Sequence, residues 1–439
     1  MEMIDSTTTN QQYGSYPSPY LVAATDRYYN VASDYVEKQR KKLKKSSKPA
    51  SRKNLRILIT TYWDYPAVGG LQNYITTLKN ELEKLGHHVD IVAPNQFPKN
   101  SKELKKKLVK ETKQFYTNRY GCYNKKIVKE NARLSRYEMI LRTMDLENYD
   151  IFHAQDRFTA NVIGRLNKEY NKPLLFTPHG FMTQRKLSLN LIERGSLEEA
   201  FYLSLDQIAI ECSDRVIALC EAFRPSLKKI GARDHQITTV YTGIDNHFEP
   251  KSKTKNNKKV ITCISRLRPR KGHKYLFDAL ASIESELDDV EVWIVGDGEM
   301  REELVKQVQE LKLNNVTFLG ERKDIPTLLS LSDIFVLPTT SDTLPISIIE
   351  AMFAEKPILT TNIGGIPEII ANHHTGLLVE SGDSKQLAES LSLLLSDATL
   401  REALAQNART FAEKNLCSVT MAEKIVGIYQ SIRLRRESR

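Results

Sequence analysis

Short apolar runs alternate along this chain with longer stretches in which apolar residues recur at helical spacing. The first clear run is "LRILIT" at Leu55–Thr60. Five more follow in the first 243 residues: "HVDIVAP" from His88, "DIFHAQ" from Asp150, "PLLFTPH" from Pro173, "RVIALC" from Arg215 and "ITTVYTG" from Ile237. Runs of this length that are apolar on both faces are typical of parallel strands covered by helices on both sides. The pattern predicts a doubly wound α/β domain.

A polar stretch, "NHFEPKSKTKNNKKV", then interrupts the alternation. The alternation restarts with "VITCIS" from Val260, "VEVWIVG" from Val290, "VTFLG" from Val316, "DIFVLP" from Asp333, "PILTT" from Pro357 and "GLLV" from Gly376. A chain of 439 residues is longer than those that usually fold around a single hydrophobic core, so two domains are expected. We expect Rossmann-like domains at 54–245 and 259–415, a linker at 246–258, and a closing helix in 416–439 that packs back across the domain junction.

The composition is that of an ordinary globular protein, with 41% hydrophobic residues. No apolar stretch is long enough to span a bilayer, and the N-terminus lacks the cationic head and apolar run of a secretory signal. The five cysteines are scattered without a C-x-x-C pair. This pattern suits free thiols in a reducing compartment and argues against a metal cage, so we expect a cytoplasmic protein.

The net charge of +10 is concentrated in two segments. Residues 36–53 carry nine Lys and Arg against one Glu, and residues 99–133 carry twelve against three Glu. Residues 1–53 are expected to be a largely disordered basic arm with room for one short helix. The two segments could be solvated surface, or they could attach the protein to an anionic membrane on its inner face. No groove-reading motif accompanies them, so nucleic acid is not expected as a partner.

The residues that follow the strands are the main candidates for binding a ligand, because ligands of parallel sheets bind outside the carboxyl ends of the strands. Gly69 and Gly70 follow the first strand and lead into a helix, where free N–H groups can meet an anion. His179 follows "PLLFTP" and could meet a ligand hydroxyl. An ordinary tight turn and a structural histidine are the competing interpretations. Neither G-x-G-x-x-G nor a P-loop is present.

The second half of the chain is more informative. Arg266 and Lys271 in "SRLRPRKG" are two cations at a strand end, which suits a diphosphate. Gly296 in "VGDGE" begins another glycine-rich turn. In "SDTLPISIIE", Asp342 and Glu350 are either the solvated ends of a loop and a helix, or two acids in one binding site.

Taken in order, these motifs make the chain resemble the family-4 glycosyltransferases, which are retaining enzymes of GT-B fold. The resemblance rests on Gly69-Gly70, "TPHG", "SRLRPRKG", "VGDGE", "FLGERKDIPTLLSLSDIFVLPTTSD", "IEAM" and "GGIPE", and covers about residues 55–430. It implies two Rossmann-like domains that face each other across a cleft. A UDP- or GDP-linked sugar would bind on the C-terminal side, and a glycan or lipid-linked acceptor on the N-terminal side.

The resemblance also implies roles for single residues. Glu350 matches the family acid that holds the ribose hydroxyls, and Asp342 stands where the family has a Glu near the sugar. Thr343-Leu344-Pro345 replaces the usual Gly-Phe-Gly. The expected catalytic residues are Arg266, Lys271, His179 and Asp342, and the expected donor-binding residues are Gly69, Gly70, Glu350, Leu344, Ile346 and Gly296. No D-x-D follows a strand, so neither a metal nor another cofactor is expected.

The expected activity is therefore hexosyl transfer with retention of the anomeric configuration, in the synthesis of polysaccharide or cell-envelope glycoconjugates. In that family, transfer is described as front-face attack, with the leaving diphosphate taking the acceptor proton. Two alternatives stay open on the residues alone. The chain could be a catalytically degenerate GT-B protein that binds a membrane surface or serves assembly, or it could be a nucleotide-sugar epimerase.

Overall fold

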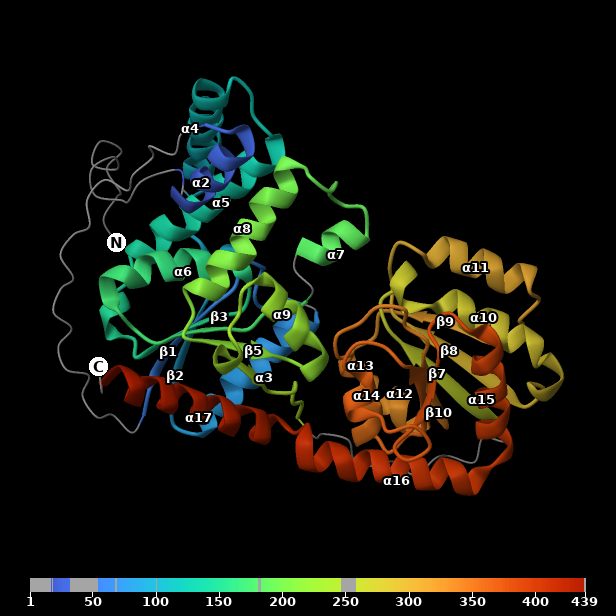
Figure 1. The fold of residues 1–439 in the computed structure, drawn as a ribbon. Coiled ribbons are helices and arrows are strands. Elements are labelled where there is room, and N and C mark those ends of the chain that lie inside the picture. Colours follow the sequence, from blue (N-terminus) through green and yellow to red (C-terminus); the bar gives the residue numbers. More distant parts are fainter. Residues whose placement is uncertain are drawn as a thin grey trace. The chain divides into compact units, whose positions relative to one another are not determined.

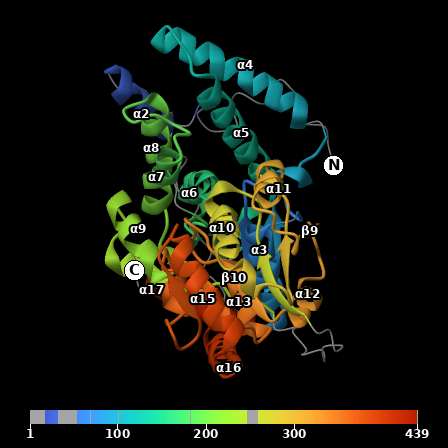
Figure 2. The ribbon, with the colours of Figure 1, turned by 90° about the vertical axis from the view of Figure 1, so that its right-hand side faces the viewer.

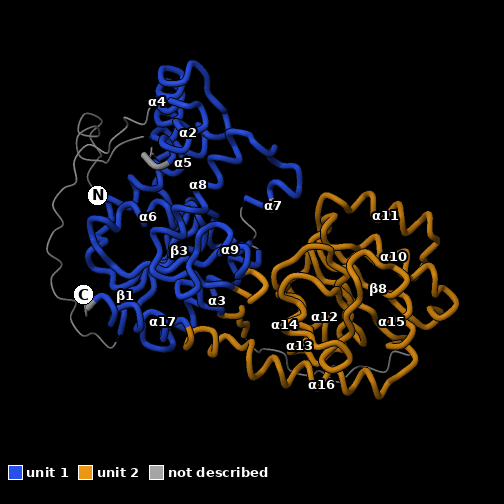
Figure 3. Tube along the Cα trace, viewed as in Figure 1, with its two compact units in different colours: residues 1–218, 224–239, 425–439 blue, residues 219–223, 240–424 orange. Residues whose placement is uncertain are grey.

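The protein folds into two compact units, which are coloured separately in Figure 3. The computed structural model describes residues 17, 19–31, 54–67, 69–99, 101–180, 183–245 and 258–437. Unit 1 comprises residues up to 218 together with 224–239 and 425–439, and unit 2 comprises 219–223 and 240–424. Each unit is therefore built from more than one segment of the chain, whereas the sequence predicted two consecutive domains. Most of the predicted linker lies outside the described residues.

Unit 1 contains a six-stranded sheet whose neighbouring strands are all parallel, in the order β2-β1-β3-β4-β5-β6. Its strands are β1 (Arg56–Thr60), β2 (His88–Val92), β3 (Ile151–Ala154), β4 (Leu174–Phe176), β5 (Arg215–Ala218) and β6 (Ile237–Thr239). All six were predicted. Ile57, Leu58 and Ile59 in β1 are each fully buried, so burial is continuous along the strand. This pattern requires cover on both faces of the sheet.

Helices supply that cover. The helices of unit 1 are α2 (Pro19–Tyr29), α3 (Gly70–Lys84), α4 (Ser101–Tyr120), α5 (Lys125–Arg142), α6 (Arg157–Tyr170), α7 (Thr183–Ser188), α8 (Leu197–Glu211) and α9 (Arg224–Ile230). Figure 1 shows α6 and α8 on one side of the sheet and α3 on the other. Right-handed crossovers require this, since α3 leads to a strand on one side of β1 and α6 leads to a strand on the other.

Unit 2 repeats the architecture with the strand order β12-β11-β10-β7-β8-β9, again parallel throughout. The strands are β7 (Lys259–Ile264), β8 (Val290–Val295), β9 (Val316–Gly320), β10 (Ile334–Leu337), β11 (Ile358–Thr361) and β12 (Leu377–Val379). The helices are α10 (His273–Ser282), α11 (Arg301–Glu310), α12 (Ile325–Leu331), α13 (Ile346–Phe353), α14 (Ile366–Ile369), α15 (Ser384–Ser396) and α16 (Ala398–Asn415). These strands were also all predicted, so the fold class is confirmed as two doubly wound parallel sheets.

The N-terminal arm contains one short helix, α2, for which the sequence analysis left room. This helix packs on α8, and its Leu21 and Val22 are buried. Asp26 is buried as well and pairs with Arg119 of α4, with Oδ1 and Nε 2.7 Å apart. The apolar face of α2 is short, and the rest of the arm is polar and basic. A helix of this length is stabilised mainly by its packing against tertiary partners. The basic run at 36–53 lies outside the described residues.

The second basic segment, 99–133, forms most of a helical hairpin made of α4 and α5, which pack against each other. Figure 2 shows the two helices from the side. Leu108 and Tyr116 are buried, whereas Lys102, Lys106 and Lys107 are exposed. The hairpin thus keeps its apolar stripe inside and presents its lysines outside.

The last helix, α17 (Ser418–Glu437), begins in unit 2 and ends in unit 1. Within unit 1, the Tyr429 hydroxyl lies 2.7 Å from Nδ1 of His153, and Arg436 donates to both carboxylate oxygens of Asp214 at 2.9 Å. Within the described part of the chain, no helix combines the length and apolar character that crossing a membrane requires.

Candidate functional site

The turn after β7 is fixed to the segment that follows β10. The Arg270 carbonyl accepts hydrogen bonds from the Thr340 N–H at 2.7 Å and from the Thr339 hydroxyl at 2.9 Å. Gly272 has a φ of 73°, and a Cβ there would collide with the carbonyl oxygen of Pro338. Only glycine accepts both constraints without strain. The carboxyl ends of β7 and β10 are therefore held side by side.

Three charged side chains meet at this junction. Lys271 donates from Nζ to the Asp342 carboxylate, and Arg270 Nη1 lies 3.0 Å from the second carboxylate oxygen. Arg270 also donates to the carbonyl of Ser341 at 2.9 Å. Burial alone would raise the pKa of the Asp342 carboxyl, but the two cations outweigh it and hold that pKa below its usual value. Asp342 is therefore ionised and clamped between two cations.

Sequence reasoning predicted Lys271 and Asp342 but did not single out Arg270. The motif "SRLRPRKG" contains Arg270 directly before Lys271, so the sequence offered it as a further candidate cation. Which of the cations in that turn would face the β10 loop depends on the turn's backbone. That backbone forms a short 3-10 turn at Pro269–Lys271, and the sequence alone did not specify it.

Arg266 and Gly296 differ in what they offer a ligand. Arg266 is exposed, and its guanidinium has no partner among the described residues. Gly296 already donates its N–H to the carbonyl of Gly320 at 2.8 Å. A Cβ on Gly296 would collide with the Ser265 carbonyl oxygen, so this glycine lets the turn after β8 approach the turn after β7.

Helix α13 presents the second predicted acid. Its first-turn amides, including that of Ile346, have no carbonyl within the helix to bond. Leu344 just before it has a buried side chain. One turn further on, Glu350 is partly exposed, and no described residue hydrogen-bonds or pairs with its carboxylate. Its surroundings disfavour the charged form and raise the pKa of Glu350 to about 7.

The turn after β11 completes this edge of unit 2. Gly364 has a φ of 55°, and a Cβ there would collide with the carbonyl oxygen of Asp342. Gly365 donates its N–H to the Thr343 carbonyl at 2.7 Å. The strand ends thus bring Arg266, Lys271, Asp342 and Glu350 to one edge of the sheet of unit 2.

In unit 1, the predicted residues also cluster at strand ends. Gly69 caps α3, and its carbonyl accepts from the Asn73 N–H at 2.9 Å. His179 donates from Nε2 to the side-chain oxygen of Gln155, 2.9 Å away, and its ring meets the Tyr74 ring edge-on at 4.6 Å. The dense surroundings lower the pKa of His179 to about 3, although part of its surface is exposed. The imidazole is neutral, and Nδ1 is an acceptor.

His153, also at a strand end, has a structural role. It is fully buried, and its two ring nitrogens lie 2.7 Å from the hydroxyls of Tyr429 and Thr177. Burial lowers the pKa of His153 to about 3. With both nitrogens occupied, the ring has no atom left for a ligand. Among the residues that the structure describes, no group of three or more His, Cys, Asp or Glu side chains could hold a metal ion.

Two family models match the chain in succession. "Glycosyltransferase Family 4" matches residues 68–248, and "Glycosyl transferases group 1" matches residues 245–411. Together they account for most of the described residues of both units.

Individual glycosyltransferases and related proteins are also similar to this chain. The chain is 29% identical over 331 residues to UDP-Gal:alpha-D-GlcNAc-diphosphoundecaprenol alpha-1,3-galactosyltransferase of Escherichia coli, covering 70% of this chain and 81% of that protein. It is 26% identical to N-acetyl-alpha-D-glucosaminyl L-malate synthase of Bacillus anthracis, covering 86% of this chain and 96% of that protein. The crystal structure of HepE of Anabaena in complex with UDP and glucose shares the fold, with a TM-score of 0.64, 21% identity and coverage of 86% of this chain and all of that one.

The two tandem parallel sheets, the ordered series of strand-end motifs and the matches to both halves of one family agree with each other. The chain belongs to the family-4 glycosyltransferases and is a glycosyltransferase of GT-B fold.

Proposed function

We propose that this glycosyltransferase moves a hexosyl group from a UDP- or GDP-linked donor to a glycan or lipid-linked acceptor, with retention of configuration and without a metal ion. The observation that carries the proposal is the group of Arg266, Lys271, Asp342 and Glu350 at one edge of unit 2. It combines cations for a diphosphate with a carboxylate that has no partner in the described part of the chain. The relative from Escherichia coli, whose name specifies a UDP-linked galactose and a diphosphoundecaprenol acceptor, supports this class of donor and acceptor.

The cations of unit 2 would bind the donor diphosphate. Arg266 is exposed and has no described partner, so its guanidinium can fork across two phosphate oxygens. Lys271 and Arg270 are held in place by Asp342 before any ligand arrives. An incoming diphosphate would share these cations with Asp342. Cations fixed in advance stabilise charge that grows on the leaving diphosphate, because they need not reorganise during the reaction.

The two acids would have different roles in the donor site. Glu350 would accept hydrogen bonds from ribose hydroxyls, and the amides at Leu344 and Ile346 would donate to the donor. Asp342 has the shorter side chain and is bound to Lys271, so we assign it to positioning the cations beside the transferred sugar. Gly296 would contribute to the donor site through the close packing of its turn, since its own N–H is already bonded.

Unit 1 would contribute polar groups from the ends of β1 and β4. The first-turn amides of α3, after Gly69 and at Gly70, can stabilise an anion. His179, neutral and fixed by Gln155, can accept from a hydroxyl through Nδ1. An imidazole whose pKa lies so far below the ordinary value is a weak general base. His179 would therefore orient a hydroxyl. This fits a front-face reaction in which the leaving diphosphate takes the acceptor proton.

We further propose that the protein works on the inner face of a membrane, as a peripheral protein. The basis is the exposed lysines of the α4–α5 hairpin, together with the basic run at 36–53 in the sequence. Each basic residue near an anionic surface contributes about 1 kcal/mol of attraction.

The direct test of the proposed function is a transfer assay with UDP- and GDP-linked sugars and a set of glycan and lipid-diphosphate acceptors. We expect a new glycoside whose anomeric proton, followed by NMR, shows the configuration of the donor, and a rate unaffected by EDTA. An isomerised sugar nucleotide without a new glycoside would indicate an epimerase. Unchanged donor with every acceptor would indicate a binding protein, and an inverted product would contradict the proposed stereochemistry.

Arg266→Ala and Lys271→Ala should each lower kcat by about 10²–10³-fold, because each removes a charge that stabilises the leaving diphosphate. Arg266→Ala should leave the melting temperature unchanged, because the side chain is exposed. The matched control is Arg268→Ala, which removes an exposed arginine from the same turn. We expect it to change turnover by no more than about twofold. Equal loss in Arg266→Ala and Arg268→Ala would refute a specific diphosphate contact.

Nucleotide binding should depend on pH through Glu350. Burial raises the pKa of Glu350 to about 7, so part of the molecules carry a protonated carboxyl at neutral pH. Ribose hydroxyls donate to the carboxylate, so binding should strengthen by up to about tenfold between about pH 6 and pH 8, with release of protons. Calorimetry with UDP and GDP in two buffers measures both effects. In Glu350→Gln only the titration of the nucleotide itself should remain, and an unchanged pH dependence in that variant would exclude this role.

Binding to anionic vesicles tests the membrane proposal. The full chain should bind vesicles that contain phosphatidylglycerol, and salt should weaken this binding steeply as the Debye length falls from about 10 Å at 0.1 M to about 3 Å at 1 M. Neutral phosphatidylcholine vesicles are the control. Equal binding to both kinds of vesicle would contradict the proposal.

A further inference from the structure

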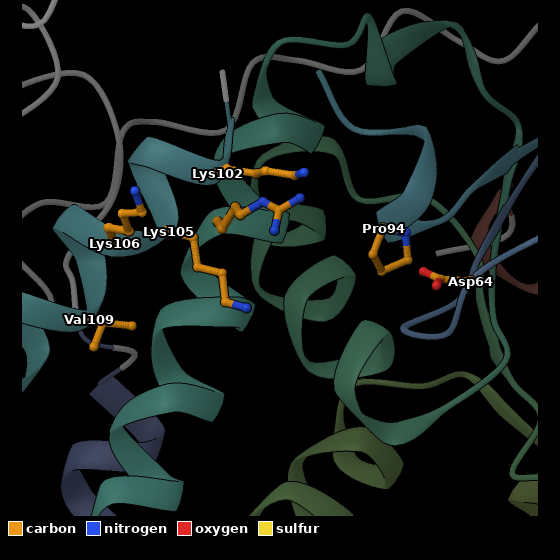
Figure 4. A pocket seen from close by; sticks show the side chains of 7 residues that line it. Asp64, Pro94, Lys102, Lys105, Lys106 and Val109 are labelled. Carbon is orange, nitrogen blue, oxygen red and sulfur yellow. The ribbon is translucent and has the colours of Figure 1, made fainter. Parts of the chain in front are cut away.

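Unit 1 contains a pocket of about 640 Å³ that belongs to none of the strand-end clusters described above. It is lined by α4, α5 and the segments that follow β1 and β2 (Figure 4). Four cationic side chains line it, Lys102, Lys105, Lys106 and Arg136, and the only acid among its lining residues is the exposed Asp64. A pocket with this excess of positive charge attracts anions.

The cations of this pocket are poorly neutralised by the protein. Lys106 pairs with Glu103, 2.8 Å away, but both side chains are largely exposed. Lys102, Lys105 and Arg136 have no ion-pair partner among the described residues. Arg136 stacks over the Phe97 ring at 4.9 Å, and its Nε is buried without an acceptor. A buried donor without an acceptor is uncommon and calls for a partner.

Glu130, an acid of the neighbouring pocket, is already engaged. A second, smaller pocket of about 290 Å³ shares Lys105 with the first and is lined further by Lys129, Glu130 and Arg133. Glu130 accepts a hydrogen bond from the Tyr62 hydroxyl and lies 3.7 Å from Arg133. Burial, together with Arg133 and Arg136, lowers the pKa of Lys105. The fold thus holds like charges close together, at a cost in stability that an anion between them would offset.

We infer that this pocket binds a phosphate or diphosphate group. Phosphate oxygens accept from several donors at once, and here Lys102, Lys105 and Arg136 line one cavity. The pocket lies in unit 1, whereas Arg266 and Lys271, the cations assigned to the donor diphosphate, lie in unit 2. The pocket would therefore hold a second phosphate-bearing ligand. That this ligand is the acceptor rests on the proposed function, but binding itself does not.

Inorganic pyrophosphate is the probe for the test, and calorimetry on the full chain is the measurement. UDP or GDP, whichever binds in the calorimetry proposed above, first fills the donor site at saturating concentration, so that pyrophosphate reports on the pocket alone. We expect pyrophosphate to bind the nucleotide-saturated protein at one site. Lys105→Gln/Arg136→Gln should weaken this binding by at least about tenfold, because two charge-assisted contacts are lost. Binding of the nucleotide should not change.

The matched control is Lys107→Gln/Lys110→Gln, which removes two exposed lysines of α4 that line neither pocket. It lowers the net charge equally and should retain pyrophosphate binding within about twofold. Equal losses in the two double variants would mean diffuse attraction and would overturn the site, as would absence of pyrophosphate binding to the wild type. If Lys105→Gln/Arg136→Gln melts early, the exposed Lys102→Gln replaces it, with the same expectation of weaker binding.

Two sources of the phosphate are distinguished by vesicles that contain phosphatidylglycerol. If the pocket holds a phospholipid headgroup, pyrophosphate should displace the protein from these vesicles, and Lys105→Gln/Arg136→Gln should bind them less well than the control variant. If it holds the diphosphate of an acceptor, pyrophosphate should bind without affecting attachment to the vesicles. Either result supports the site, and each can be obtained whether or not the protein transfers a sugar.

Discussion

The clamp of Asp342 between Arg270 and Lys271 determines the chemistry of unit 2, because it joins the turn after β7 to the loop after β10. Two cations at one strand junction would repel each other and destabilise both turns. A carboxylate bonded to each removes that repulsion and keeps Asp342 ionised despite its burial. The glycines at 272 and 364 serve the same end, since each lets a carbonyl approach where any side chain would collide. Ion pairing and backbone packing therefore both stabilise the same arrangement of the turns after β7, β10 and β11.

Glu350 shows the opposite balance. It lies on α13, one turn from the helix start, and none of the described residues places a cation beside it. Desolvation is unopposed, so its pKa rises while that of Asp342 falls. Two acids that look alike in "SDTLPISIIE" thus differ in charge near neutral pH. One is satisfied by the protein, and the other retains hydrogen-bonding capacity that a ligand can use.

Unit 1 handles positive charge differently. Its α4–α5 hairpin gathers lysines and arginines around shared pockets with few acids to neutralise them. The apolar stripes of both helices provide the stability that tolerates this repulsion, and α2 adds a buried ion pair to the outer side of α4. The concentration of these charges around cavities distinguishes the hairpin from an ordinary solvated helix face.

The sequence by itself determined the fold class and all twelve strands, because apolar runs bounded by turns specify parallel strands by local pattern. It also placed Arg266, Lys271, Asp342 and Glu350 at strand ends, since strand ends follow from the strands. Tertiary structure alone decided which charges meet. The pairing of Lys271 with Asp342 spans 71 residues, and Arg270 joined them through a backbone turn that no local pattern specified. The folding of α2 and the charge state of Glu350 likewise depend on neighbours distant in sequence, because burial and Coulomb interactions act through space.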